Sequence, residues 1–109
     1  MEKNNCYNLV FSSSASIYGA TKLNQVSEKA KINPMNPYAN TKAVIEKLLW
    51  DVFSNSKKNW KIMSLRYFNP IGAHSSGLIG ESAKGIPNNL FPIILKVASG
   101  FEKKLKIFG

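Results

Sequence analysis

A tyrosine and a lysine four residues apart, Tyr38 and Lys42, have residue types and a spacing that could carry out proton transfer. Side chains at positions i and i+4 of a helix are neighbours on one face. A lysine that points toward a core is costly unless its charge has a use. Because a cation beside a phenol favours the phenolate, we interpret the pair as a candidate general base.

Three consecutive serines, Ser12, Ser13 and Ser14, follow an apolar run at residues 7–11. The run is typical of a short buried strand, which we expect to end at the serines. Ligands of an open parallel sheet bind beyond the carboxyl ends of its strands. The serines therefore place hydroxyl groups at the edge of the sheet where a ligand is expected.

The clearest element of the sequence is a helix that contains Tyr38 and Lys42. Asn36 is a favourable N-cap, and Pro37 suits the first helical position. Apolar residues then recur with the spacing of one helical face, which we expect to be buried together with Tyr38 and Lys42. The helix should end near residues 55–58. The apolar residues of this face are Ile45, Leu48, Leu49, Val52 and Phe53.

A second strand is predicted at residues 60–67, so that one strand lies on each side of the helix in the sequence. Two strands joined by a long helix form a βαβ unit, which implies a parallel sheet and an α/β fold. Residues 16–35, between the serines and the helix, are expected to form a loop with one weak turn.

The remaining residues are predicted to be less regular. Residues 69–87 are rich in Gly, Ser and Pro and should form a long ordered loop, of a kind that often carries function. Residues 90–99 are predicted to form a second helix, which Gly100 would cap beyond its end. Residues 105–108 are expected to form a short strand.

This topology would bring a hydroxyl, a phenol and an ammonium group to one edge of the sheet. A serine would orient a substrate alcohol, Tyr38 would accept its proton, and Lys42 would hold the phenolate. A nicotinamide cofactor would accept the hydride that leaves the alcohol carbon. We predict no metal site, because cysteine and histidine do not cluster, and we expect the only histidine, His74, to be structural or exposed.

Composition limits the classes of function. The chain has 109 residues, of which 44% are hydrophobic, as expected for one small globular domain. The net charge is +9, but the basic residues are scattered without interleaved aromatic residues, so we predict no nucleic-acid binding. No apolar run approaches the ~20 residues needed to cross a membrane. The single cysteine, Cys6, and the lack of a signal-peptide pattern predict a cytoplasmic protein.

Several segments resemble one known enzyme family, the UDP-glucose 4-epimerases of the extended short-chain dehydrogenase/reductase family. The serine and Tyr-x-x-x-Lys motifs identify the superfamily, whereas Arg-Tyr-Phe-Asn-Pro and Gly-Ile-Pro-Asn-Asn-Leu narrow the resemblance to the epimerase branch. The segments are Ser-Ser-Ser-Ala-Ser-Ile-Tyr-Gly at 12–19, Asn-Pro-Tyr-Ala-Asn-Thr-Lys at 36–42, Leu-Arg-Tyr-Phe-Asn-Pro-Ile-Gly-Ala-His at 65–74, and further matches at 76–81, 85–90 and 105–109.

The resemblance implies an α/β fold with a partial Rossmann-type parallel sheet, in which a βαβ core precedes the start of a substrate-binding region. Residues 1–70 would form the C-terminal half of an NAD-binding domain that carries the catalytic serine and the Tyr-x-x-x-Lys motif. Residues 71–109 would begin the region that binds a nucleotide sugar.

The resemblance also implies roles for individual residues. Ser14 would contact the sugar 4-hydroxyl, Tyr38 would be the base, and Lys42 would contact the nicotinamide ribose and tune Tyr38. The expected cofactor-binding residues are Ser12, Ser13, Ser14, Tyr38, Lys42, Tyr67 and Phe68. The expected substrate-binding residues are Ser14, Tyr38, Asn69, Asn89, Leu90, Lys106, Ile107 and Phe108.

The reaction implied by the resemblance interconverts UDP-glucose and UDP-galactose, a step of galactose metabolism. A hydride would pass from sugar C4 to NAD, the 4-keto sugar would turn over, and the hydride would return to the other face. A homodimer is implied for the full-length enzyme. Within the motifs the chain departs from the family at Ala39 and Ser75, neither of which touches the expected chemistry.

We further expect the chain to be the central third of such an enzyme, because no Gly-rich phosphate loop precedes the serines. The isolated chain should then be inactive, bind NAD weakly or not at all, and expose a sheet edge and an apolar sheet face. Two other interpretations stay open. One is a non-catalytic remnant that acts as a binding or interaction module; the other is a small basic nucleic-acid binder, which the scattered lysines disfavour.

Overall fold

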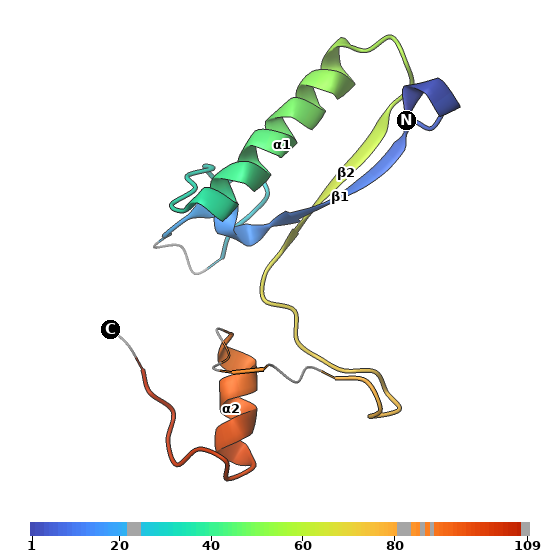
Figure 1. The fold of residues 1–109 in the computed structure, drawn as a ribbon. Coiled ribbons are helices and arrows are strands. Elements are labelled where there is room, and N and C mark those ends of the chain that lie inside the picture. Colours follow the sequence, from blue (N-terminus) through green and yellow to red (C-terminus); the bar gives the residue numbers. More distant parts are fainter. Residues whose placement is uncertain (22–24, 81–83, 86, 88, 108–109) are drawn as a thin grey trace. The chain divides into compact units, whose positions relative to one another are not determined.

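The structure is a computed structural model, in which residues 1–21, 25–80, 84–85, 87 and 89–107 are described (Figure 1). Its contacts divide the chain into two units, Met1–Phe68 and Asn69–Gly109. The elements of the first unit are η1 (Glu2–Asn4), β1 (Asn8–Ser14), η2 (Ala15–Tyr18), α1 (Pro37–Asn55) and β2 (Lys61–Tyr67), where η marks a 3-10 helix, and the second unit contains α2 (Leu90–Ala98).

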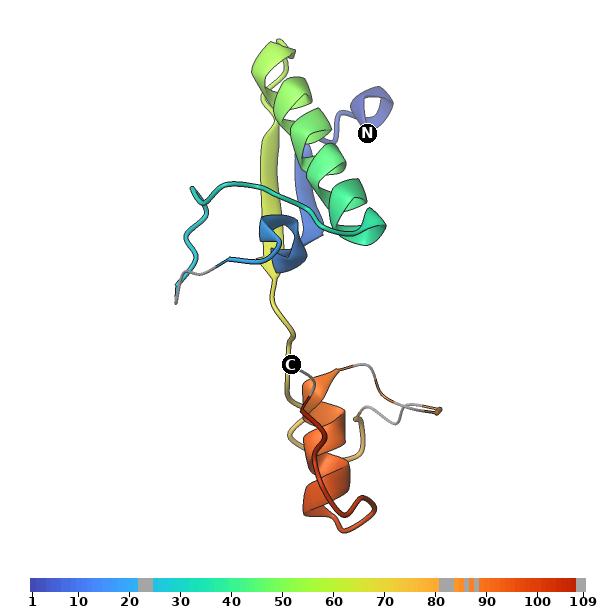
Figure 2. The ribbon, with the colours of Figure 1, turned by 90° about the vertical axis from the view of Figure 1, so that its left-hand side faces the viewer.

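Strands β1 and β2 form a parallel pair, with α1 between them in the sequence. Their register runs from Asn8 opposite Lys61 to Ser14 opposite Tyr67. Helix α1 lies along one face of the two strands in both ribbon views (Figures 1 and 2). The predicted βαβ unit and parallel pairing are therefore confirmed.

Strand β1 is longer than predicted, because it continues through the three serines and ends at Ser14. Each of these serines has a partner in β2, from Ser12 opposite Leu65 to Ser14 opposite Tyr67. Pairing with a neighbouring strand decides the conformation here, since the strand preference of single residues is weak and depends on context. The prediction that the strand stops before the serines was wrong.

The start of α1 has the predicted cap. Asn36 is the N-cap residue, and its Oδ1 accepts a hydrogen bond of 2.8 Å from the backbone N–H of Ala39. Pro37 follows as the first helical residue, where its missing N–H costs nothing. The helix ends at Asn55, within the predicted region.

The predicted buried stripe of α1 overlaps only in part with the face that packs, where Lys42 and Leu49 are half-buried. Ala39 is fully buried, whereas Tyr38 is 58% exposed and Ile45 is 38% exposed. The first turn of α1 packs against η2 as well as against the strands, and small Ala39 permits this close approach. Periodicity identifies the helix, but the elements beneath it decide which of its faces is covered.

The core of the first unit is small and lies around η2 and the two ends of the strands. Ile17 is fully buried, and Tyr18 and Trp60 are each 7% exposed. Trp60 makes an edge-on contact with Tyr7, with ring centres 5.4 Å apart.

The sheet face opposite α1 remains open. Val10 and Met63 are paired in the register, and they are 64% and 59% exposed. The uncovered apolar sheet face expected from the sequence is therefore confirmed. Open apolar surface of this kind marks a place where a protein makes further contacts.

The segment between η2 and α1 folds back onto η2. The backbone N–H of Asn33 donates a 2.8 Å hydrogen bond to Ile17 O. Gly19 has φ 65°, and a Cβ at this position would overlap the carbonyl oxygen of Asn33. Only glycine therefore permits this return of the chain. A loop was predicted for residues 16–35, but residues 16–18 lie in η2; residues 19–21 and 25–35 are irregular apart from one turn at 28–29.

The second unit is described by local elements. Helix α2 begins after Asn89 and ends one residue earlier than predicted. Gly100, with φ 79°, donates to Val97 O at 3.1 Å and caps the helix as expected. The prediction of a strand at residues 105–108 was wrong for residues 105–107, which are irregular, and residue 108 lies outside the described residues.

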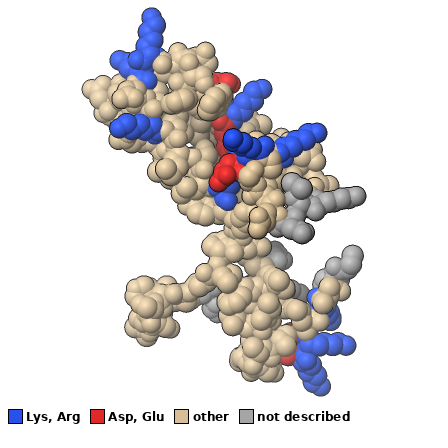
Figure 3. All heavy atoms as spheres, turned by 180° about the vertical axis from the view of Figure 1, so that it is seen from behind, with Lys and Arg blue, Asp and Glu red and all other residues tan. Residues whose placement is uncertain are grey.

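Within the described residues, no helix combines the length and the apolar character that crossing a membrane would require. On the face of the first unit seen in Figure 3, the Lys and Arg side chains lie at separate places around the surface. On that face they do not merge into one basic patch, which agrees with the scattered distribution along the sequence.

Candidate active site

The three serines differ in position at the end of β1. Ser12 is exposed, Ser13 is buried with 4% of its surface accessible, and Ser14 is half-buried. Successive side chains of a strand point to opposite faces, so Ser13 lies on the face covered by α1 and Ser12 on the open face. In the register, Ser13 lies opposite Arg66 and Ser14 opposite Tyr67.

Ser14 is both the last residue of β1 and the N-cap of η2. Its Oγ accepts hydrogen bonds from the backbone N–H of Ser16 at 3.2 Å and from the Ser16 hydroxyl at 2.9 Å. A hydroxyl has two acceptor lone pairs and one donor hydrogen. The backbone N–H of Ser16 fixes Ser14 Oγ as an acceptor, whereas either hydroxyl can donate in the bond between the two serines, so the Ser14 O–H can turn to a substrate oxygen.

Lys42 reaches from α1 to the serine segment. Its Nζ donates a 2.8 Å hydrogen bond to Ser12 O and lies 5.1 Å from the centre of the Phe11 ring. Both contacts are on β1, so the ammonium group lies at the carboxyl half of that strand. This is the position predicted from the topology of a parallel sheet.

Tyr38 lies beside Lys42, as the four-residue spacing predicts. The Lys42 Nζ is 5.6 Å from the centre of the Tyr38 ring. The Tyr38 side chain is 58% exposed, and its hydroxyl forms no hydrogen bond with a described residue. A phenol that is adjacent to an ammonium group and open to a ligand can act as a proton acceptor.

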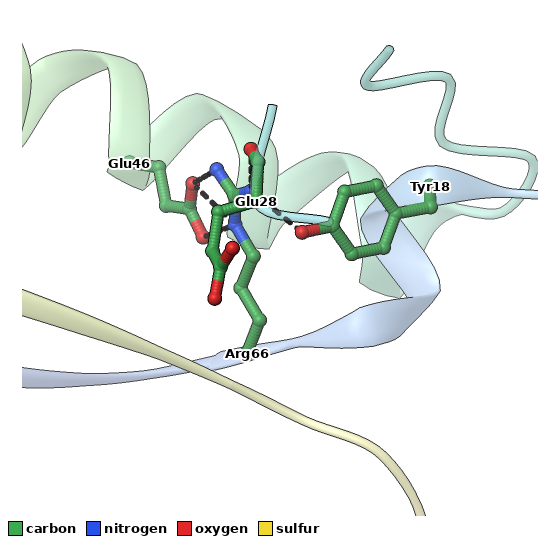
Figure 4. A network of polar contacts seen from close by, with 4 residues as sticks. All are labelled: Tyr18, Glu28, Glu46 and Arg66. Atoms are coloured by element: carbon green, nitrogen blue, oxygen red, sulfur yellow. Dashed lines mark hydrogen bonds and ion pairs between the residues drawn. The ribbon is translucent and has the colours of Figure 1, made fainter. Parts of the chain in front are cut away.

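Arg66 forms the most connected polar group near these residues (Figure 4). Its Nη2 and Nε donate to the carboxylate of Glu46 on α1, at 2.6 Å and 3.0 Å. Its Nη1 donates to the Tyr18 hydroxyl at 2.8 Å and to Glu28 O at 2.9 Å. The guanidinium therefore joins β2 to α1, to η2 and to the segment around Glu28 that lies between η2 and α1 in the sequence.

The pair of Glu46 and Arg66 remains charged at neutral pH. Burial acts to raise the pKa of Glu46 above its usual 4.5, but the hydrogen bonds and charge of Arg66 outweigh burial and lower the pKa. The Ser13 hydroxyl also acts to lower this pKa, although its Oγ makes no hydrogen bond of standard geometry. Hydrogen bonding to Glu46 in turn raises the pKa of Arg66.

The other predicted site residues fall into two groups. Tyr67 ends β2 beside Ser14, and both Tyr67 and Phe68 are well exposed, at 49% and 69%. The second group belongs to the second unit, where Asn89 is the N-cap of α2, Leu90 begins that helix, and its other described members lie in irregular segments. The members of the second group are Asn69, Asn89, Leu90, Lys106, Ile107 and Phe108, of which Phe108 lies outside the described residues.

A comparison with protein-family models gives one match that covers the chain. The model described as the NAD dependent epimerase/dehydratase family matches residues 1–109. The chain belongs to this family. The Tyr-x-x-x-Lys motif and the serine strand end both lie within the matched residues.

Named relatives within the epimerase/dehydratase family include 4-epimerases. The chain is 53% identical to the bifunctional protein GAL10 of Pachysolen tannophilus and 47% identical to a UDP-glucose 4-epimerase of Cyamopsis tetragonoloba. Both alignments cover the whole chain. The chain spans 16% of the first relative and 31% of the second, so it corresponds to about a third or less of their lengths.

Solved structures show the same arrangement of elements. The chain matches a UDP-glucose 4-epimerase from Stenotrophomonas maltophila, with bound NAD and formylated UDP-arabinopyranose, at a TM-score of 0.88 and 45% identity. It matches the enzyme from Bifidobacterium longum, in complex with NAD+ and UDP, at a TM-score of 0.81 and 44% identity. Each match covers the whole chain and 32% of the solved structure, and together they confirm the Rossmann-like α/β fold.

Sequence reasoning missed the roles of Arg66, Glu46 and Tyr18. One signal was present: Arg66 is the single arginine among the fifteen basic residues, all others being lysine. A second signal was the position of Glu46 one helical turn beyond Lys42. An arginine in a predicted strand, facing an acidic residue on the crossover helix, is a pattern that favours a bidentate ion pair.

Proposed function

We propose that the protein containing this chain is an NAD-dependent 4-epimerase that interconverts UDP-glucose and UDP-galactose. The observation that carries the proposal is the hydrogen bond from Lys42 Nζ to Ser12 O. It fixes the Tyr-x-x-x-Lys motif against the strand whose last residue is Ser14. The names of the relatives support the substrate class, since 47–53% identity extends over the whole chain.

The residues of this chain divide the proton chemistry between them. The Ser14 O–H, whose oxygen is already engaged as an acceptor, donates to the sugar 4-oxygen and orients it. Tyr38 accepts the proton of the 4-hydroxyl through its exposed phenol. Lys42 stabilises the phenolate through its positive charge, and Ser12 O keeps the ammonium group in place.

The donor set fits a nicotinamide cofactor. An ammonium group, a phenol and backbone groups of the serines lie at the carboxyl end of β1, where dinucleotides bind in open parallel sheets. Lys42 and Tyr38 would hold the nicotinamide ribose, with Ser12, Ser13, Tyr67 and Phe68 beside them. When bound, NAD supplies the hydride acceptor for sugar C4 and returns the hydride after the 4-keto sugar turns over.

The predicted partners and setting remain part of the proposal. We propose a homodimer for the full-length protein and a role in galactose metabolism, both on the strength of the family resemblance. We place the protein in the cytoplasm, which agrees with the single exposed and unpaired cysteine, Cys6. Residues 71–109 would supply the start of the surface that binds the UDP-sugar.

The test is an assay of UDP-galactose conversion to UDP-glucose by the full-length protein and its Tyr38→Phe variant. Removing the phenol oxygen should lower kcat on the order of 10²- to 10⁴-fold, the usual contribution of a general base. Tyr7→Phe is the matched control, because Tyr7 contacts Trp60 and Asn5 away from the serines. Full activity of Tyr38→Phe would refute the role of Tyr38. An inactive wild type would instead favour a non-catalytic binding module.

A further inference from the structure

Arg66 joins three segments that are far apart in the sequence. Its contacts reach Glu46, 20 residues away, Glu28 O, 38 residues away, and Tyr18, 48 residues away. Figure 4 shows the guanidinium between the Glu46 carboxylate and the Tyr18 hydroxyl. All five donor positions of an arginine lie in one rigid plane, so bonds from that plane fix the relative orientation of its partners.

We propose that Arg66 is a positioning residue that sets the distance between the Tyr-x-x-x-Lys helix and the serine end of β1. This proposal rests on the proposed function, because the residues that it positions are Tyr38, Lys42 and Ser14. Arg66 itself acts through Glu46 and Tyr18 and touches none of these three residues in the bonds described. Its effect is therefore on geometry, not on proton transfer directly.

The helix α1 is tied to both strands on successive turns. Lys42 donates to Ser12 O on β1, and Glu46, four residues later, accepts from Arg66 on β2. The two side chains of α1 have opposite charges, and they bind to neighbouring strands. Sliding or rotation of α1 would break one of them, so together they fix the helix in its register on the sheet.

The serine end is tied to the same guanidinium. Ser14 is the N-cap of η2, and η2 ends at Tyr18, whose hydroxyl accepts from Arg66. The Arg66 guanidinium also lies over the Tyr18 ring, 5.2 Å from its centre. A shift of Arg66 would therefore move η2 and the Ser14 cap relative to Tyr38 on α1.

The position of Ser13, the middle serine of the triplet, explains why its side chain is small. It lies opposite Arg66 in the register and is buried on the face that α1 covers. A larger side chain at this position would occupy the space that the Arg66 and Glu46 pair fills. The three serines thus have separate tasks: a carbonyl for Lys42, a small residue beneath the ion pair, and a hydroxyl for the substrate.

The experiment compares Arg66→Lys with Lys47→Arg in the full-length protein. Lysine keeps the charge of Arg66 but loses its planar fork, and Lys47→Arg is the reverse exchange on the exposed side of α1. We expect Arg66→Lys to lower kcat about 10- to 100-fold, with KM changed less than about twofold, at a temperature where the variant is fully folded. Lys47→Arg should keep both constants.

A second variant, Tyr18→Phe, tests the proposal even if Arg66→Lys fails to fold. Tyr18→Phe removes one hydrogen bond and keeps the ring, so it should lower kcat about two- to tenfold while remaining folded. If Arg66→Lys and Tyr18→Phe are both folded and both keep wild-type kcat, the proposal is overturned. A lower melting temperature with unchanged kcat would also overturn it, since that result describes a stabilising residue only.

Hydrogen exchange separates this proposal from the proposed function. The amides of Gly19 and Asn33 are bonded to Ser16 O and Ile17 O, within the segment that Arg66 holds. Arg66→Lys should accelerate exchange of both amides by about tenfold or more if the guanidinium orders that segment. Faster exchange in a protein without epimerase activity would show that Arg66 orders the segment and would refute the reaction. Unchanged exchange would refute the positioning role.

Discussion

The two units of the chain differ in the contacts that each makes within itself. In Met1–Phe68, described side-chain hydrogen bonds link residues up to 48 positions apart, and the two longest are both donated by Arg66. In Asn69–Gly109, the described side-chain hydrogen bonds are short in sequence, such as Ser99 Oγ to Leu95 O, and the longest spans the 11 residues between Lys96 and Gly85. Long-range contacts define a tertiary fold, whereas local ones define only turns and helices.

The two units also differ in how far their apolar side chains are buried. Ile17 and Ala39 of the first unit are fully buried, whereas Leu78, Phe101 and Ile107 of the second are 84–89% exposed. Burial of apolar surface is the main favourable contribution to folding. The residues expected to catalyse therefore lie in the unit that has its own core. Most residues expected to bind the sugar nucleotide lie in the unit whose apolar side chains are open to further contacts.

The largest expected effect is the loss of the Arg66 side chain. Arg66→Met leaves the Glu46 carboxylate, whose side chain is only 9% exposed, without its partner. We expect the free energy of unfolding of the full-length protein to fall by about 3–5 kcal/mol, measured by urea denaturation. Lys96→Met in the second unit removes one exposed contact and should change it by less than about 0.5 kcal/mol. Equal losses would contradict the contrast between the units.

A smaller but still large effect is expected at Gly19. Gly19→Ala introduces a Cβ that overlaps Asn33 O at a positive φ, so we expect a loss of about 3 kcal/mol in the free energy of unfolding. Gly77 also has a positive φ, but its Cβ would meet no atom within 4 Å. Gly77→Ala should therefore cost only about 1 kcal/mol, from backbone strain alone. The difference between the two free energies of unfolding measures the cost of disturbing the close approach of Asn33 to Gly19.

The helix caps give a matched pair of asparagines. Asn36→Ala removes the side-chain bond to the Ala39 amide and should lower the free energy of unfolding by about 1 kcal/mol. Asn89 occupies the same position of α2 but makes no side-chain cap bond. Asn89→Ala should consequently have little effect on stability, as read by circular dichroism during thermal unfolding. A larger loss at Asn89 would show that this residue has contacts that α2 alone does not provide.

The smallest effect concerns pH. The folded pKa of Glu46 is lowered from 4.5, so its contribution to stability is complete above that value and is lost as pH falls through the lower folded value. The free energy of unfolding should therefore decline as pH is lowered below about 4.5, more steeply in the wild type than in Glu46→Gln. Parallel pH profiles of the two proteins would mean that this carboxylate does not contribute.

The parts of the fold that could be predicted have local signals. Helix α1 was recognisable because Asn36 and Pro37 mark its start, and Gly100 marks the end of α2. Tyr38 and Lys42 could be recognised as a pair because helical spacing alone makes them neighbours. In each case the residues that determine the structure lie within one or two turns of one another.

The parts that could not be predicted depend on distant partners. Strand β1 includes the serines because β2, more than 40 residues later, pairs with them. The covered face of α1 is decided by η2 and the strands, so Ala39 is buried while Tyr38 and Ile45 are exposed. The role of Arg66 depends on partners at three separate positions, and no short sequence pattern contains them all.

The two tryptophans of the chain differ sharply in environment, and this gives the chain a built-in optical contrast. Trp60 is enclosed at the start of β2, whereas Trp50 on α1 is 66% exposed and lies beside Phe53. Iodide in solution should quench the emission of Trp50 and spare that of Trp60. Fluorescence can thus follow the outer side of α1 and the interior of the first unit separately, with a Trp50→Phe variant to assign each signal.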